Sequence, residues 1–226
     1  KSAYEAALAG DPTSAFGGVL ACNRTVDADT ANAMNSLFFE VVTAPDYTQE
    51  ALDILKSKKN RIILKLKQTL SQKKMFKSLL NGVLEQDIDW SSESAESCKV
   101  VYSKQPSPEQ FKDLVFAIKA VKHLKSNGIT LVKNAQLIGM GCGQTSRVDA
   151  LESAIKKAKA FGFDTNGCVM ASEAFFPFPD CVSIAGTAGI SAIAQPGGSI
   201  KDQDSINEAD KNGQAMVLTG IRHFKH

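Results

Sequence analysis

The 226-residue chain lacks the features that mark several common classes of protein. No apolar run approaches the roughly 20 residues that a membrane-spanning helix needs, and no charged and then apolar leader opens the chain. The net charge of +2 is too small to indicate a surface for nucleic acid or for an anionic membrane. The sequence therefore predicts a globular protein that binds neither of them and that meets any anionic ligand with local groups.

Cysteine patterns of the kind that build disulfide frameworks or zinc sites are also missing. The five cysteines are odd in number and widely spread, and no Cys-x-x-Cys pair occurs. We therefore expect a reducing cytosolic location and no bound metal. The chain also begins at Lys1 without an initiator Met, inside a helical pattern, so we expect it to be part of a longer polypeptide.

Apolar patterns typical of strands and helices alternate along the first 66 residues, which indicates an α/β layer structure. Asp27 stands where a helix N-cap is expected. The spacing predicts helices over 1–9, from 28 to 37 and over 48–56, and strands over 19–22, 41–43 and 61–66.

Residues 67–105 predict a connecting region, in which 79–84 is a strand or a hairpin and 91–97 is a polar linker. After it, Ser107, Pro108 and Gln110 form a capping-box pattern that predicts a helix ending near 126–128. A hairpin follows, with Asn134 in its turn at positive φ. Helices opened by Ser146-x-x-Asp149 and Ser199-x-x-Asp202 alternate with strands over 190–194 and 215–219.

Two glycine-rich segments admit two interpretations each. Gly139, Gly141 and Gly143 lead into the helix that starts at Ser146, where backbone N–H groups can approach an anion. Glycines at alternate strand positions are equally typical of close backbone packing, and no dinucleotide-binding fingerprint is present. The segment 195–199 fits a ligand site or a tight turn.

The segment 175–180 (FFPFPD) combines three Phe rings and two prolines with a final carboxylate. It predicts either a stiff wall for a flat heteroaromatic ring or a core aromatic cluster whose Asp180 caps the next helix. The ending 222–226 (RHFKH) is either a solvated tail or a held segment with Arg222 gripping a phosphate or carboxamide. Lys122 and His123 have an ordinary explanation as cations near a helix C-terminus.

Four segments in fixed order resemble the transformylase part of one family, the bifunctional purine-biosynthesis enzymes that formylate aminoimidazole carboxamide ribonucleotide (AICAR) and close the ring to IMP. They are 133–147 (KNAQLIGMGCGQTSR), 175–180, 195–199 and 222–226. The segments 11–18 (DPTSAFGG) and 125–127 (KSN) extend the resemblance over most of the chain.

The resemblance implies a cytidine-deaminase-like three-layer α/β/α fold. Residues 1–66 would end one copy, 67–105 would connect, and 106–226 would form a second copy. It also implies that AICAR and 10-formyltetrahydrofolate are the substrates and that a homodimer shares its active site between subunits.

Site residues follow from the same resemblance, with Asn127 in a catalytic position where it hydrogen-bonds the substrate carboxamide. The ribonucleotide site would comprise Phe16, Gly17, Glu40, Asn127, Arg147, Arg222, Phe224 and His226. The folate site would comprise Val148, Phe175, Pro177, Phe178, Asp180, Gly198 and Ser199. Pro179 departs from the Arg of many members, so a folate-tail contact from that position is not expected.

Formyl transfer requires proton removal from a weakly nucleophilic amine, positioning of two large substrates and stabilisation of charge on the formyl oxygen. In the family a Lys-His pair upstream of Lys1 moves the proton, and the cyclohydrolase domain also precedes the transformylase. We therefore expect no turnover by this chain alone. Two other hypotheses are a non-catalytic nucleotide-binding module and an α/β protein whose glycine loops are purely structural.

Overall fold

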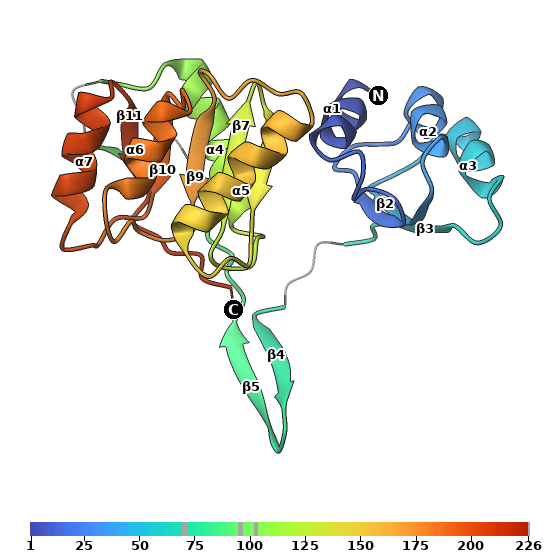
Figure 1. Cartoon of the computed structure of the whole chain (residues 1–226). Helices are drawn as coiled ribbons and strands as arrows, with labels where there is room; N and C mark the ends of the chain where they lie inside the picture. The colour runs from blue at the N-terminus through green and yellow to red at the C-terminus, as the bar shows by residue number, and fades with distance from the viewer. Residues whose placement is uncertain (69–71, 95–96, 102–103, 226) are drawn as a thin grey trace. The chain divides into compact units, whose positions relative to one another are not determined.

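A computed structural model describes residues 1–68, 72–94, 97–101 and 104–225 (Figure 1). The chain divides into two compact units, Lys1–Trp90 and Ser91–His226. The division falls inside the region 67–105 that the sequence predicts to be connecting. Helices and strands alternate in both units, so the predicted α/β class is confirmed.

The first unit is built around a parallel sheet of order β1-β2-β3. Asp27 and Thr48 cap α2 and α3, because their side chains accept hydrogen bonds from backbone N–H groups three residues on, at 2.8 and 3.2 Å. The predicted cap at Asp27 is confirmed, and the structure adds the cap at Thr48. The elements are α1 (Ser2–Gly10), β1 (Gly18–Ala21), α2 (Ala28–Asn35), β2 (Phe39–Ala44), α3 (Gln49–Lys56) and β3 (Ile62–Lys65).

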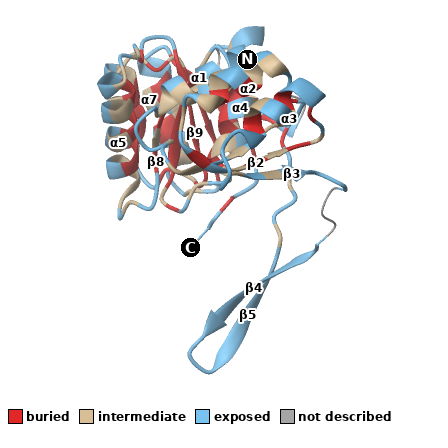
Figure 2. Cartoon of the chain, turned by 90° about the vertical axis from the view of Figure 1, so that its right-hand side faces the viewer, coloured by how far each residue is buried: buried red, intermediate tan, exposed pale blue. Residues whose placement is uncertain are grey.

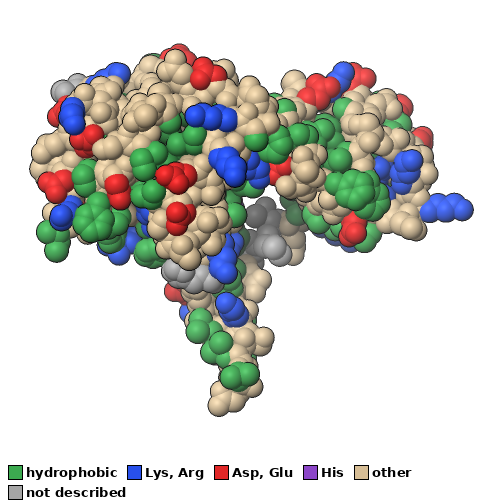
Figure 3. Space-filling model, in the orientation of Figure 1, with side chains coloured by type: hydrophobic (Ala, Val, Ile, Leu, Met, Phe, Trp, Pro, Cys, Tyr) green, Lys and Arg blue, Asp and Glu red, His purple; other side chains and the backbone are tan. Residues whose placement is uncertain are grey.

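The segment with the open strand-or-hairpin prediction is a hairpin of β4 (Lys74–Leu79) and β5 (Gly82–Asp87). Every residue of both strands is exposed, as the pale-blue arrows of Figure 2 show. Apolar side chains gather along it (Figure 3), among them Phe76 and Leu80. This hairpin contributes no buried side chain to the core of the first unit.

The second unit contains a six-stranded sheet of order β6-β11-β10-β9-β7-β8. Strands β9, β10 and β11 run parallel, whereas β7 is antiparallel to both β8 and β9. The elements are β6 (Lys99–Val100), α4 (Pro108–Val121), β7 (Ile129–Lys133), β8 (Gln136–Gly141), α5 (Arg147–Ala160), β9 (Val169–Ser172), α6 (Asp180–Thr187), β10 (Ala192–Gln195), α7 (Asp202–Lys211) and β11 (Ala215–Leu218).

Helices cover both faces of this sheet. On one face α4 buries Leu114 and Ile118 against strand residues that include Val169. On the other face α5, α6 and α7 pack on the sheet around Leu151 and Phe176 (Figure 1). The second unit therefore has the expected three layers, helix, sheet and helix.

Local predictions in the second unit are confirmed where partners lie close in sequence. Ser107 and Gln110 form both bonds of the capping box, at 3.2 and 2.8 Å. Asn134 has φ 54° in the hairpin turn. The helix α4 ends at Val121, before the predicted 126–128, because the His123 and Leu124 N–H groups bond to carbonyls only three residues back, at 3.1 and 2.9 Å. Farther on, the Ser126 N–H bonds to the Lys225 carbonyl at 2.9 Å.

The predicted cap of α7 is wrong. This helix begins at Asp202, its N-cap is Lys201, and no side chain caps it. Ser199 Oγ accepts a bond from the Lys201 N–H at 3.1 Å, while the Asp202 carboxylate accepts the Gly198 N–H at 2.6 Å. The carboxylate therefore braces the preceding turn, which competes with its use in a capping pattern.

Candidate functional site

The glycines of β8 serve packing against α5. A Cβ atom on Gly139 would lie 2.3 Å from the Ala154 carbonyl oxygen, and one on Gly141 would lie 2.0 Å from that of Ala150. Only a glycine lets the strand and helix backbones approach this closely. For these two positions the close-packing interpretation is correct. The start of α5 is fixed by Ser146, whose side chain accepts the Asp149 N–H at 3.0 Å.

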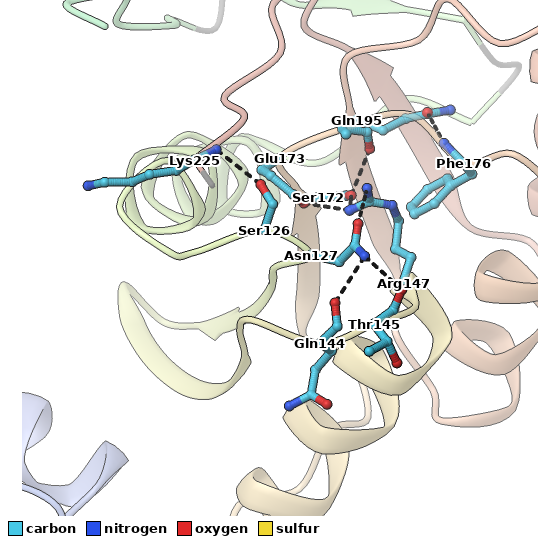
Figure 4. A network of polar contacts seen from close by, with 11 residues as sticks. Ser126, Asn127, Gln144, Thr145, Arg147, Ser172, Glu173, Phe176, Gln195 and Lys225 are labelled. Atoms are coloured by element: carbon cyan, nitrogen blue, oxygen red, sulfur yellow. Dashed lines mark hydrogen bonds and ion pairs between the residues drawn. The ribbon is translucent and has the colours of Figure 1, made fainter. Parts of the chain in front are cut away.

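Arg147, the first residue of α5, is the centre of a buried polar network (Figure 4). Its guanidinium pairs with Glu173 at 2.5 Å, donates to Ser172 Oγ at 3.1 Å and donates to Asn127 Oδ1 at 2.9 Å. The side chains of Arg147 and Glu173 are 9% and 0% exposed. Three acceptors fix the orientation of the Arg147 guanidinium, whereas Glu173 Oε1 is buried without a hydrogen-bond partner among the described residues.

Asn127 is held from both ends of its amide. Its Nδ2 donates to the carbonyl oxygens of Gln144 and Thr145 at 3.0 and 3.2 Å, while Oδ1 accepts from Arg147. These donors and acceptors define the orientation of the amide. Because an amide oxygen has two lone pairs, Oδ1 keeps capacity for one further hydrogen bond.

A cavity of about 420 Å³ opens beside this network, within the unit 91–226. Its walls come from the loop before β7, the N-terminus of α5, the segment after β9 and the C-terminal tail. They are formed by Asn127, Thr145, Ser146, Arg147, Val148, Ala174, Phe175, Pro177, Phe178, Asp180, Cys181 and Phe224. The volume is in the range of small-ligand pockets.

The Phe-Pro segment divides between the two predicted roles. Phe176 is fully buried and belongs to the core, and its N–H donates to Gln195 Oε1 at 3.2 Å (Figure 4). Phe175 and Phe178 line the cavity instead, and Phe178 is 53% exposed. The predicted helix cap by Asp180 is wrong, because α6 begins at Asp180 itself and has no side-chain cap.

The carboxylate of Asp180 lies at the cavity and accepts the Cys181 N–H at 2.7 Å. Burial, assisted by this neighbouring carboxylate, raises the pKa of the Cys181 thiol to about 12. Cys181 is therefore a neutral wall of the cavity and not a thiolate nucleophile at neutral pH.

Arg222 connects the Phe-Pro wall to the second glycine-rich turn. Its guanidinium carbon lies 4.7 Å from the centre of the Phe175 ring, a cation–π contact. A Cβ atom on Gly198, which has φ +94°, would lie 3.2 Å from Arg222 Nη2. Gly198 and the adjoining Ser199 thus form a tight turn that borders the Arg222 guanidinium.

The C-terminal tail is held, which settles the choice between a solvated and an ordered end. The His223 N–H donates to the Glu173 carbonyl at 2.9 Å, and the Lys225 N–H donates to Ser126 Oγ at 3.1 Å. The predicted residue His226 lies outside the described residues. Phe224, in the held part, reaches the cavity.

The region 91–97 is more than the polar linker that the sequence predicts. Glu93 is 3% exposed, and its Oε1 lies 3.0 Å from His223 Nε2. Burying a carboxylate costs free energy unless a partner compensates for the lost hydration. Here the partner, His223, is 130 residues away in the sequence. Residues 95 and 96 lie outside the described residues.

Three predicted residues, Phe16, Gly17 and Glu40, belong to the first unit. The rings of Phe16 and Phe38 are 5.1 Å apart, and the Gly17 N–H donates to the Phe38 carbonyl at 2.9 Å. Glu40 is exposed and lines a separate cavity of about 680 Å³ together with Arg61.

Sequence reasoning missed Ser172, Glu173, Glu93 and His223. For Glu173 a signal existed, since it is a charged residue between an apolar strand and an aromatic segment.

Within the described ranges, no three His, Cys, Asp or Glu side chains gather as metal ligands. In the same ranges, every helix is too short or too polar to cross a membrane. Acidic and basic side chains alternate over the face shown in Figure 3.

Comparison with known proteins gives a consistent family. The family model described as AICARFT/IMPCHase bienzyme matches residues 1–157. The bifunctional purine biosynthesis protein PurH of Bacteroides thetaiotaomicron is 58% identical over 224 residues, covering 99% of this chain and 44% of the relative. PurH of Persephonella marina is 48% identical over 229 residues, with 100% and 44% covered. The chain thus spans less than half the length of these curated relatives.

Solved structures share only a distant likeness. The dCMP deaminase of cyanophage S-TIM5 in apo form has a TM-score of 0.36 at 16% identity, covering 50% of this chain and 98% of that one. A diaminohydroxyphosphoribosylaminopyrimidine deaminase/reductase from Thermotoga maritima has a TM-score of 0.31 at 20% identity, with 48% and 34% covered. Scores this low carry no argument, and the α/β class is established by the elements of the chain itself.

Proposed function

Because the chain belongs to the AICARFT/IMPCHase bienzyme family, we propose that it supplies the substrate-binding residues of a folate-dependent formyltransferase. The reaction transfers a formyl group from 10-formyltetrahydrofolate to the 5-amino group of AICAR in purine biosynthesis. The observation that carries the proposal is the cavity of about 420 Å³ in the second unit. Its lining includes residues of both proposed subsites, Asn127 and Arg147 for the ribonucleotide, and Phe175 and Asp180 for the folate.

Asn127 is proposed to orient the AICAR carboxamide next to the reacting amine. Its Nδ2 is occupied by two loop carbonyls, so Oδ1 is the atom that can accept a substrate N–H. Arg147 holds that oxygen in place at 2.9 Å. Fixed geometry of this kind lowers the entropy cost of bringing the amine to the formyl carbon.

The folate ring is proposed to lie on the wall formed by Phe175, Pro177 and Phe178, with Val148 opposite. An apolar wall supplies contact area, while a single carboxylate fixes orientation. Asp180 Oδ1 accepts one backbone N–H, and the remaining lone pairs of the carboxylate can accept the N–H donors of a pterin edge. Gly198 and Ser199 would contact the ligand from the neighbouring turn.

Arg222 and Phe224 are proposed to complete the ribonucleotide site, with Arg222 binding phosphate through its fork of N–H donors. Phe16, Gly17, Glu40 and His226 remain proposed members of that site. A homodimer with a shared active site remains a proposal too. Lys122 and His123 are not among the cavity-lining residues, so neither is proposed to move the proton.

Calorimetry on the complete natural polypeptide that contains this chain tests the assignment. Asn127→Ala is expected to weaken AICAR binding by about tenfold or more, and Asp180→Asn to weaken reduced-folate binding with AICAR affinity unchanged. Asp164→Asn, an exposed carboxylate in the same unit, is the control. AICAR binding without any effect of folate would favour the non-catalytic module, and binding of neither would refute the proposal.

Activity gives a second measurement. The complete polypeptide should formylate AICAR, and the 226-residue chain by itself should show no turnover. Full activity of the isolated chain would contradict the proposed division of labour.

A further inference from the structure

We propose that Glu93 is a positioning residue for the ribonucleotide site: through His223 it holds the C-terminal tail so that Arg222 and Phe224 face the cavity. The inference rests on the proposed function, because it uses AICAR affinity as the readout. It extends that function to the segment 91–97, in which most of the other residues are serines.

The Glu93–His223 pair is almost completely enclosed. The two side chains are 1% and 2% exposed, and Oε1 and Nε2 are 3.0 Å apart. On either side of Glu93, Ser92 and Ser94 are exposed. The segment therefore inserts a single carboxylate into the protein, and desolvating that carboxylate is tolerated only because the imidazole meets it.

His223 stands out within the tail 221–225. Its side chain is buried, whereas Ile221 and Arg222 before it and Phe224 and Lys225 after it are exposed. The exposed neighbours reach the proposed site, since Arg222 stacks on Phe175 at 4.7 Å and Phe224 lines the cavity. Anchoring the His223 side chain in the interior therefore restricts the backbone from which Arg222 and Phe224 extend.

Backbone bonds set the path of the tail, and the contact with Glu93 anchors the His223 side chain in the interior. The His223 N–H bonds to the Glu173 carbonyl at 2.9 Å, and the Ser126 N–H bonds to the Lys225 carbonyl at 2.9 Å. Glu173 also pairs with Arg147 through its carboxylate. The tail is thus bonded to Glu173, the residue that orients Arg147. A displacement of His223 would therefore shift Arg222 and Phe224 relative to the cavity.

The test compares Glu93 variants in the complete natural polypeptide. Glu93→Ala removes the carboxylate that meets His223 Nε2 and is expected to raise the Kd for AICAR about tenfold, with reduced-folate affinity changed less than about threefold. Glu93→Gln keeps an oxygen acceptor and is expected to stay within about threefold of the unaltered protein for both ligands. This rescue by the isosteric variant separates positioning from loss of fold.

Thr130→Val is the matched structural control. Thr130 is fully buried in β7, and its Oγ1 donates to the Ala117 carbonyl at 3.0 Å. Its removal should lower stability without changing AICAR affinity. If Glu93→Ala fails to fold, Glu93→Asp takes its place, because a carboxylate shortened by one methylene cannot reach His223, and the same loss of affinity is expected.

Two outcomes separate failure of this inference from failure of the proposed function. An AICAR Kd unchanged in Glu93→Ala, or in Glu93→Asp where that stands in, but weakened in Arg222→Ala would overturn the positioning role and leave the proposed function in place. An AICAR Kd unchanged in both Arg222→Ala and Asn127→Ala would overturn the proposed function, and the positioning role with it.

Discussion

Replacing Gly141 by alanine tests why glycines occupy β8. An added Cβ atom would lie 2.0 Å from the Ala150 carbonyl oxygen and 2.7 Å from its carbonyl carbon, whereas ordinary contact begins at 3.4 Å. Both atoms belong to the backbone of α5, so no side-chain rotation relieves the clash. The helix must move away from the strand by about 1 Å or more, which disrupts a densely packed layer.

The magnitude follows from two opposing effects. Overpacking against rigid backbone costs about 3 kcal/mol, at the upper end of the usual range. Alanine restricts the unfolded chain and returns up to about 1 kcal/mol. The free energy of unfolding of Gly141→Ala should therefore fall by about 2 kcal/mol or more.

Urea denaturation followed by circular dichroism measures this loss. Gly82→Ala is the control, because nothing lies within 4 Å of a Cβ atom at that position, and its stability should be unchanged or slightly increased. A loss below about 0.5 kcal/mol for Gly141→Ala would refute the packing argument. Unchanged stability combined with lost phosphate-ligand binding would instead support the anion-loop interpretation.

Two further predictions concern buried groups of the second unit. Glu173→Ala should lower the free energy of unfolding by about 3–5 kcal/mol, because it leaves the Arg147 guanidinium buried without its carboxylate. Adding Arg147→Met should recover part of that loss, and a double variant no more stable than the single one would contradict this reasoning. Iodoacetamide at neutral pH should label exposed Cys142 and spare Cys168 and Cys181, whose pKa burial raises to about 12; equal labelling in a mass spectrum of the native protein would contradict that protection.

Much of the candidate site was reached through family resemblance and not through local pattern. Asn127 and Asp180 have no periodic signal, and each has an ordinary structural explanation in its own segment. Only the folded structure shows that both residues line one cavity. Neither spacing nor composition carries that information, because the loop before β7 and the start of α6 are far apart in sequence.

For the glycine-rich segments, too, the sequence could not choose between a structural and a binding role. The sequence allowed Gly141 to bind an anion or to pack closely, since a missing Cβ serves both purposes. The position of the α5 backbone decides between them. Likewise, Asp202 fits a capping pattern with Ser199, but its carboxylate bonds to the Gly198 N–H.

The amino-acid sequence alone determined the α/β class and most element boundaries, because caps and turns are completed within three or four residues. Asp27 and Ser107 each accept a bond from an N–H three residues away, so their spacing is sufficient. Only the tertiary structure decided that Glu93 meets His223 across 130 residues. A buried charge must find its partner wherever the folded chain brings one, and no local rule fixes that distance along the sequence.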